Sequence, residues 1–391
     1  MREQFQITKE LLQSFCMKRS NSISHSYGIF APCIPSRIMP DLTPVPRDRE
    51  IAERLLCAYR KSKNVEKLRS CELDDIWSCI QSHQSTFFAI LERGDPTLLA
   101  SYLCNMNRYD ATMGTVQGYL EYVKIRFNPL YRRFISLYIK DKLVSLAEAV
   151  GAMACENPEQ GVWGKNLHTP IDEIVKAIER QIGFDITPPD IDGGLLKICG
   201  TSAQFHERDL NAIYTAWCLS NLLKTSDRSV CEIGAGAGRV AYWSWRFGIK
   251  SYSIIDLPHI NVIQGFYLLK ALPDAPIRLY GEPEITTQHD REITILPSHC
   301  IDNLSPHRFD LVLNQDSFPE IHAEIVRDYL MRIREISRKY FLSINHESSP
   351  KGGDFVQNRV RDIIDEVGGY EMLCRIPYWL RRGYVMELYE V

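Results

Sequence analysis

The sequence predicts an α/β fold in which a mostly parallel sheet, with helices on both faces, follows a mainly helical region. Helical periodicity dominates from Arg49 to about Gln181, whereas after Ser229 short β-rich runs alternate with helices. Strands that alternate with helical crossovers of this length imply parallel pairing. We therefore expect a mainly helical N-terminal region over residues 1–190 and a sheet-containing domain over residues 191–391.

Composition limits the classes of partner. The 391 residues carry a net charge of -3, which gives no electrostatic reason to expect nucleic acid or an anionic membrane as a partner. The 12 cysteines are scattered without a C-x-x-C pair, so we expect reduced thiols and no zinc site. The N-terminus lacks the apolar segment of a secretory signal, and no apolar run approaches the roughly 20 residues of a membrane span. These features predict a cytoplasmic protein.

The N-terminal region divides into an irregular leader and several helices. Residues 1 to about 45 contain Ser and Pro clusters that favour irregular structure. Asp95-Pro96 is a typical helix start, and the run Leu120–Ala154 is long enough for one or two helices. The PPDIDGG run at 188–194 predicts a junction, and a helix over Glu207–Leu223 is expected to follow it.

Seven β-rich runs define the expected sheet of the C-terminal domain. Helical stretches fill the gaps after the first, second, fourth and fifth runs. No helix separates the last two, so they should form a hairpin in which the final strand is antiparallel to the rest. The seven runs are SVCEI, SYSIIDL, ITIL, FDLVLN, KYFLSIN, YEMLCRI and GYVMELYEV.

A glycine-rich turn follows the first of these strands, in SVCEIGAGAGRVA. Gly234, Gly236 and Gly238 have the spacing G-x-G-x-G. The dinucleotide fingerprint G-x-G-x-x-G would need a glycine or alanine where Arg239 stands. A turn of this kind also occurs simply to begin a helix tightly, so its ligand has to be inferred from the residues around it.

Two acidic residues flank this turn. Glu232 precedes the first glycine, where a carboxylate would repel a pyrophosphate but suit a cationic amino group. Asp256 ends the second strand, where a carboxylate can accept hydrogen bonds from a ribose diol. The combination describes S-adenosylmethionine (SAM) better than a nicotinamide dinucleotide.

The motifs resemble those of a known family. The seven-strand pattern with its terminal hairpin is similar to the Rossmann-like class I SAM-dependent methyltransferase fold over about residues 205–391. More closely, CEIGAGAGRVAYW, IIDLPHINVIQGFYLL, FDLVLNQDSFPEI and GYVMELYEV resemble the sugar O-methyltransferase family of bacterial polysaccharide and natural-product gene clusters. The segment 94–114 resembles what precedes the catalytic domain in that family. Ala237 departs from the tyrosine expected within the glycine run.

This resemblance implies a set of cofactor-binding residues. The glycine turn and Glu232 would line the methionine end of SAM, Asp256 would bind the ribose, and the residues after the third strand would contact the adenine. The set is Glu232, Gly234, Ala235, Gly236, Gly238, Asp256, Leu257, Ser298, His299, Asn314 and Gln315.

Candidates for a general base follow the fourth and fifth strands. A hydroxyl is a poor nucleophile at neutral pH, so a positioned base is useful for its methylation. In related O-methyltransferases the base follows the fourth strand, which favours Asp316, Glu320 and His322, while His346 follows the fifth. The alternative for Glu320 and His322 is an exposed first helical turn, and for His346 a hydrogen-bonded loop histidine. No metal is expected, because Asp310 begins its strand and should point away from this edge.

Together these features predict SAM-dependent methylation of a hydroxyl on a sugar or glycosylated small molecule. The helical region would form a lid over the acceptor pocket or a homodimer interface. Three alternatives stay open: methylation of a non-sugar natural product at oxygen, nitrogen or carbon, a SAM-binding module without turnover, and a nicotinamide-dependent oxidoreductase. Glu232 and Arg239 weigh against the last of these.

Overall fold

The computed structural model describes residues 32–66, 76–116, 118–157, 159–161, 164–224, 228–283, 291–348 and 357–391. Within these ranges, eight strands form one large sheet in the order β10-β11-β9-β8-β4-β5-β7-β6, and three short strands form a second sheet. None of the helices described there combines the length and the apolar character that a membrane span needs.

The centre of the large sheet is parallel. β4 (Ser229–Ile233) pairs in parallel with β5 (Ser251–Asp256) on one side and with β8 (Phe309–Gln315) on the other. β7 (Ile293–Pro297) and β9 (Ser337–His346) extend this parallel arrangement outward. The carboxyl ends of all five strands therefore meet at one edge of the sheet, and the strand order changes direction at β4.

The last two strands form the predicted hairpin. β11 (Tyr384–Glu390) is antiparallel to both β9 and β10 (Glu371–Pro377). The predicted Rossmann-like class I methyltransferase sheet, with its last strand antiparallel, is thus confirmed by the strand order. One further strand, β6 (Ile277–Leu279), pairs with β7 at the opposite edge and was not predicted, because three residues are too few to show a periodic pattern.

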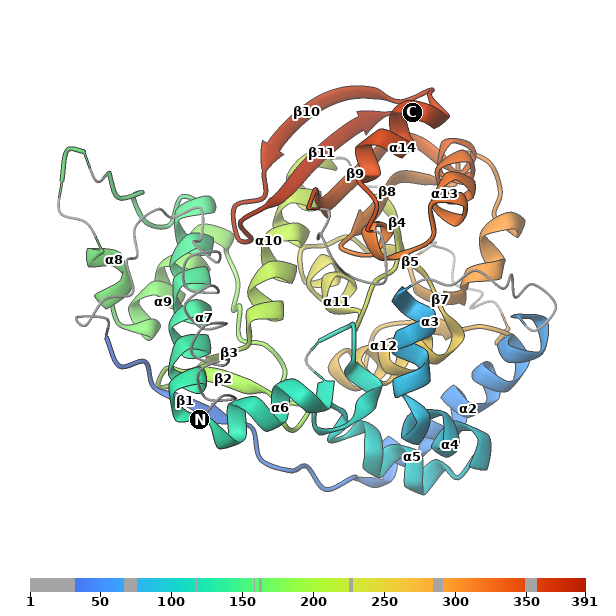
Figure 1. The fold of residues 1–391 in the computed structure, drawn as a ribbon, viewed down its shortest axis with the longest axis horizontal. Helices are drawn as coiled ribbons and strands as arrows, with labels where there is room; N and C mark the ends of the chain where they lie inside the picture. The colour runs from blue at the N-terminus through green and yellow to red at the C-terminus, as the bar shows by residue number, and fades with distance from the viewer. Residues whose placement is uncertain are drawn as a thin grey trace, which may run out of the picture.

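Helices cover both faces of this sheet, as the alternation of strands and helices predicted (Figure 1). On one face lie α10 (Glu207–Leu222), α11 (Arg239–Arg246) and α12 (Pro258–Ala271). On the other lie α13 (Ala323–Ile336) and α14 (Val360–Val367), which pack over a separate cluster of buried side chains. The face of α10–α12 is the one that meets the N-terminal region.

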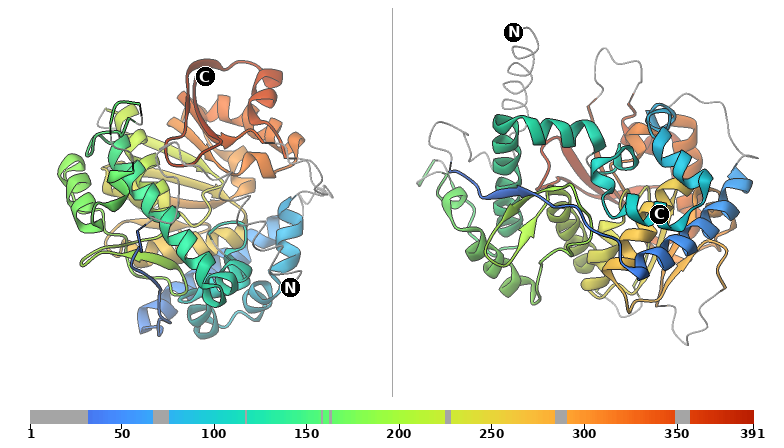
Figure 2. Two further views of the ribbon diagram at one scale, coloured as in Figure 1. Left: turned by 60° about the vertical axis from the view of Figure 1, so that its left-hand side comes forward. Right: turned by 90° about the horizontal axis from the view of Figure 1, so that it is seen from below.

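The N-terminal region wraps around one side of the sheet domain (Figures 1 and 2). α2 (Pro46–Glu66) packs on α12, and α7 (Pro129–Ala149) packs on α10. A single buried apolar cluster includes residues of both helices and of the sheet. The other helices of the region are α3 (Ile76–His83), α4 (Ser85–Arg93), α5 (Pro96–Leu103), α6 (Gly118–Phe127), α8 (Lys165–His168) and α9 (Ile171–Ile182).

A small antiparallel sheet joins the two regions. β1 (Ser36–Ile38) pairs with β2 (Leu196–Cys199), which pairs with β3 (Gln204–Phe205). Irregular structure was predicted for 36–38, and the structure corrects this. The strand forms because a partner far along the chain completes its hydrogen bonds, which no local pattern reveals. Residues 1–31 of the predicted leader lie outside the described ranges.

Candidate functional site

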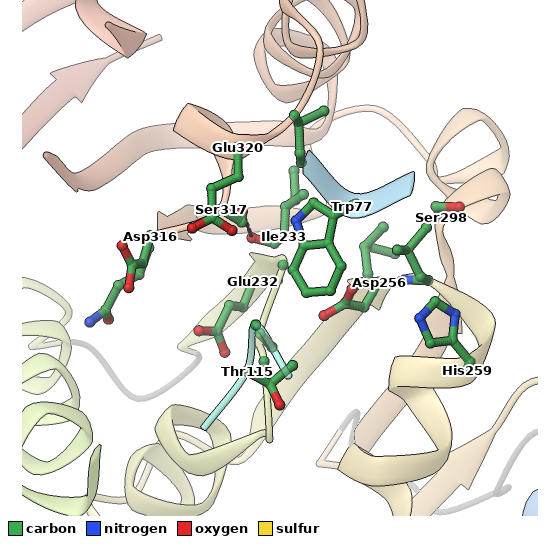
Figure 3. A pocket seen from close by; sticks show the side chains of 18 of the residues that line it. Trp77, Thr115, Glu232, Ile233, Asp256, His259, Ser298, Asp316, Ser317 and Glu320 are labelled. Carbon is green, nitrogen blue, oxygen red and sulfur yellow. Dashed lines mark hydrogen bonds between the residues drawn. The ribbon is translucent and has the colours of Figure 1, made fainter. Parts of the chain in front are cut away.

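A cavity of about 840 Å³ lies at the carboxyl ends of β4, β5, β7 and β8. Figure 3 shows its lining: Asp316 and Glu320 lie at one end, Glu232 lies near the middle, and Ser298 and His259 lie at the other end. Trp77 and Thr115, both from the N-terminal region, also line it. Ligands of open α/β sheets bind at this edge, where the strand order changes direction.

The glycine turn forms the floor of the cavity next to β4. Gly234, Gly236 and Gly238 all have left-handed backbone angles, with φ of 74°, 55° and 76°. A Cβ built on Gly234 would also lie only 2.2 Å from Oγ of Ser317. Both the backbone conformation and the close approach of the next turn therefore require glycine at this position.

Two carboxyl groups, the buried Glu232 and the half-buried Asp256, face the cavity on either side of this turn. Glu232 accepts a hydrogen bond of 2.8 Å from the Tyr252 hydroxyl, and burial raises its pKa to about 8. Asp256 accepts from the backbone N–H of Leu257 at 2.8 Å and from Nε2 of Gln264 at 2.6 Å, and burial raises its pKa to about 7. A ligand that brings a cationic amino group or hydroxyl donors would stabilise the ionised form of both.

Most of the predicted cofactor residues line this cavity, and two do not. The residues that line it are Glu232, Gly234, Ala235, Gly236, Asp256, Leu257, Ser298, His299 and Gln315. Gly238 lies behind the turn, where it is the N-cap of α11. Asn314 is fully buried beneath it.

Asn314 instead joins three strand ends. Its Nδ2 donates to the carbonyl of Ile233 at 3.0 Å and to Oγ of Ser317 at 2.6 Å. Its Oδ1 accepts from Nδ2 of Asn345 at 3.0 Å. Oδ1 of Asn345 in turn accepts from the backbone N–H of Asp316 at 3.0 Å. The two amides therefore fix β4, β8 and β9 relative to one another and position the turn that carries Asp316.

Asp316 lies in a strained, left-handed turn, and three side chains donate hydrogen bonds to its carboxylate. Its φ of 67° is unusual for a residue other than glycine. Arg208, Arg381 and Tyr384 all donate to its carboxylate. Burial alone would raise the pKa of Asp316, but the guanidinium groups of Arg381 and Arg208 outweigh burial and hold the pKa below its ordinary value. The Asp316 carboxylate is thus a poor proton acceptor, and its role is to position Arg208, Arg381 and Tyr384.

Glu320 lies one turn further on and has the opposite character. It ends a short 3₁₀ turn, Phe318–Glu320, and its side chain reaches the cavity. Burial raises the pKa of Glu320 to about 7, and the negative charge of Asp316 adds to this rise. A carboxylate with a pKa near neutrality is suited to general base catalysis.

Neither candidate histidine lines the cavity. His322 is the N-cap of α13, where its Nδ1 accepts from the backbone N–H of Glu324 at 3.3 Å. The ring of His346 packs edge-on against Tyr384, with centroids 5.5 Å apart, and burial lowers its pKa. His322 thus lies at a helix start, as its alternative described, whereas His346 is the last residue of β9 and its Nδ1 hydrogen-bonds with Oγ of Ser348 at 3.2 Å.

Several cavity residues were not among the predicted site residues. Arg208, His259 and Arg239 come from helix starts, while Trp77 and Thr115 come from the N-terminal region. Only one feature of the sequence pointed to the N-terminal region as part of the site. The segment 94–114 resembles what precedes the catalytic domain of the sugar O-methyltransferase family, and it ends next to Thr115.

Among the described residues, no group of three or more His, Cys, Asp or Glu side chains could hold a metal ion. Asp310 begins β8 and accepts from Oγ of Ser229 at 2.8 Å, whereas Asp316 follows the other end of the same strand. The length of β8 separates the two carboxylates.

Comparison with known proteins yields similar structures but no family. No family model matches the chain, and no curated protein matches it. A proposed RNA methyltransferase from Pyrococcus horikoshii is similar with a TM-score of 0.31 and 18% identity, covering 48% of this chain and 83% of its own. A SAM-dependent methyltransferase from Aquifex aeolicus has a TM-score of 0.30 and 15% identity, covering 44% and 88%. Magnesium protoporphyrin IX methyltransferase from Synechocystis PCC 6803 has a TM-score of 0.34 and 11% identity, covering 47% and 84%. The strand order, and not these scores, fixes the fold class.

Proposed function

We propose that this protein is a SAM-dependent methyltransferase. The observation that carries the proposal is a pair of carboxyl groups, the buried Glu232 and the half-buried Asp256, on either side of a glycine turn in one cavity. SAM would supply a methyl group on a sulfonium centre. The carboxylate of Glu232 would bind the amino group of its methionine part, and Asp256 would accept hydrogen bonds from the ribose hydroxyls. Ser298 and His299 would lie beside the adenine.

The donor set fits this cofactor better than a dinucleotide. A pyrophosphate needs positive charge or N–H donors. Next to the glycine turn it would instead contact the buried carboxyl group of Glu232. Arg239 also lines the cavity, but its charge is already paired with the carboxylates of Asp192 and Asp209. The missing Cβ at Gly234 leaves room for the turn at Ser317 to approach the end of β4.

We further propose that the acceptor is a hydroxyl of a sugar or glycosylated small molecule, with Glu320 as general base. At pH 7 Glu320 is about half ionised, since its pKa is about 7. Its carboxylate would take the hydroxyl proton as the oxygen attacks the methyl carbon. Asp316 would hold this end of the cavity in shape through Arg208 and Arg381. The resemblance of the sequence to sugar O-methyltransferases supports this choice of acceptor.

Titration calorimetry tests the proposed cofactor, and a methyl-transfer assay tests the proposed acceptor. We expect S-adenosylhomocysteine (SAH) to bind and NADH to give no heat, and the reverse result would overturn the methyltransferase proposal. With SAM labelled in its methyl group, label should pass to free sugars, glycosides or sugar nucleotides. Label that passes only to aglycones would refute the sugar acceptor and leave the methyltransferase intact.

A further inference from the structure

We propose that the methyl acceptor carries an oxyanion, a carboxylate or a phosphate, which Arg208 binds at the Glu320 end of the cavity. The inference rests on the proposed function, because it assigns a substrate class to the same site. It would exclude neutral sugars as good acceptors and favour uronic acids, sugar phosphates or sugar nucleotides.

Most N–H donors of the Arg208 guanidinium have no hydrogen-bond acceptor among the described residues. Its side chain lines the cavity and is 28% exposed. In the described part of the chain, its guanidinium makes one hydrogen bond, a long one of 3.4 Å from Nη1 to Oδ2 of Asp316. Arg381, by contrast, donates to both Asp316 and Tyr384 and is 16% exposed. A guanidinium has five N–H donors, in a planar fork that matches carboxylate and phosphate. Arg208 is therefore the member of this pair that is free to bind a ligand.

Arg208 lies in a cluster of ion pairs. Lys142 and Arg208 both face Glu207, with Nε of Arg208 3.9 Å from Oε1 of Glu207, and Arg208 and Arg381 both face Asp316. Nζ of Lys142 lies 3.2 Å from Oε2 of Glu207, and its side chain is 1% exposed. Burial and the positive charges of Arg381 and Arg208 together lower the pKa of Lys142 to about 7, against the pull of Glu207. An anion bound to Arg208 would favour the charged form of Lys142 as well.

The position of Arg208 places such an anion next to the reacting hydroxyl. Arg208 and Glu320 both line the cavity beside Asp316. They are close enough that the positive charge of Arg208 acts on the pKa of Glu320. An acceptor held by its oxyanion on Arg208 would therefore present a nearby hydroxyl to Glu320. A neutral acceptor could offer these donors only hydroxyl oxygens, which form weaker hydrogen bonds with a guanidinium than an oxyanion does, and this difference supplies the discrimination.

Calorimetric titration of the SAH-saturated protein tests the inference. The probes are glucuronate, glucose 6-phosphate and the neutral methyl glucoside. We expect at least one anionic sugar to bind at least tenfold more tightly than methyl glucoside. Arg208→Met should lose that difference, and Arg208→Lys, which keeps the charge without the fork, should retain part of it. The two anionic probes also separate a carboxylate ligand from a phosphate ligand.

The matched control is Arg382→Met, which removes an exposed arginine next to Arg381 in the connection between β10 and β11. It should bind the probes like the wild type. Unchanged SAH affinity of Arg208→Met would show that this variant is folded. Failure of wild type to bind either anionic sugar, or equal binding by wild type and Arg208→Met, would overturn the inference. If SAH itself does not bind, the proposed function fails instead, and the same titrations without SAH still decide whether Arg208 binds an oxyanion.

Discussion

Two carboxyl groups four residues apart, Asp316 and Glu320, differ in what they can do with a proton. Three donors surround Asp316 and keep it ionised, whereas Glu320 has a pKa of about 7 and faces the cavity. We expect Glu320→Gln to lower kcat by roughly 10²–10⁴-fold, the usual contribution of a general base. In wild type, the rate should rise with pH through about 7, because the base acts in its ionised form. The variant should lose this rise.

A pH–rate profile measured with saturating labelled SAM checks this prediction. Glu366→Gln, which changes an exposed carboxylate on α14 outside the cavity, is the control and should keep the profile of the wild type. An unchanged profile in Glu320→Gln would show that another group takes the proton.

Gly234 offers a second test of a single residue. Gly234→Ala combines a left-handed φ of 74° with a Cβ at 2.2 Å from Oγ of Ser317, whose hydroxyl is held by Asn314. We expect it to lose SAH binding at least tenfold and to unfold at a lower denaturant concentration. Gly248→Ala is a close control, because Gly248 has φ of 88° but nothing within 4 Å of its Cβ position. That variant should lose only about 1–2 kcal/mol of stability, from backbone strain alone, and bind SAH normally. Equal SAH binding in both variants would contradict a role of Gly234 in the site.

Individual residues also show where prediction from sequence succeeds. Glu232 and Asp256 end neighbouring strands, so strand order alone brings them to one cavity. His322 follows β8 and His346 ends β9, but His322 caps α13 and His346 packs against Tyr384, so neither lines the cavity. A sequence pattern places a residue at an edge and does not orient it there.

At the scale of elements, a buried ion cluster ties α11, which follows the glycine turn, to the junction at 188–194 and to α10. Arg239 begins α11, and it donates to Asp192 in the junction at 188–194 and to Asp209 in the first turn of α10. Its guanidinium also lies over the ring of Tyr267, 4.8 Å from the centroid. Thus the residue that departs from the dinucleotide fingerprint joins three segments of the fold.

We expect Arg239→Met to lower the free energy of unfolding by about 3–5 kcal/mol, because two carboxylates would stay buried without their cation. Combining it with Asp192→Asn and Asp209→Asn removes those charges and should recover most of the loss. Urea unfolding followed by circular dichroism measures both variants. If the triple variant is as unstable as the single one, the cost lies in packing and not in the unpaired charges.

At the scale of the whole molecule, the helical region and the sheet domain share one apolar core. α2 lies so close to α12 that a Cβ on Gly265 would come within 2.4 Å of Cδ2 of Leu55. β1 adds a strand to β2 across the predicted boundary at residue 190. Sequence periodicity predicted both regions, but it could not show this contact surface, because helix faces that pack on each other and helix faces that pack on a sheet have the same pattern.

A shared core of this kind predicts one unfolding transition. Trp77 and Thr115 reach the cavity from the N-terminal region, so SAH should stabilise both regions together. In scanning calorimetry of the full chain we expect a single endotherm that moves to higher temperature as SAH is added. The fragment 191–391 should fail to give a cooperative transition, because its helices α10 and α12 would expose the faces that α7 and α2 cover. Two separate endotherms, of which SAH moves only one, would show instead that the helical region folds on its own and merely rests on the site.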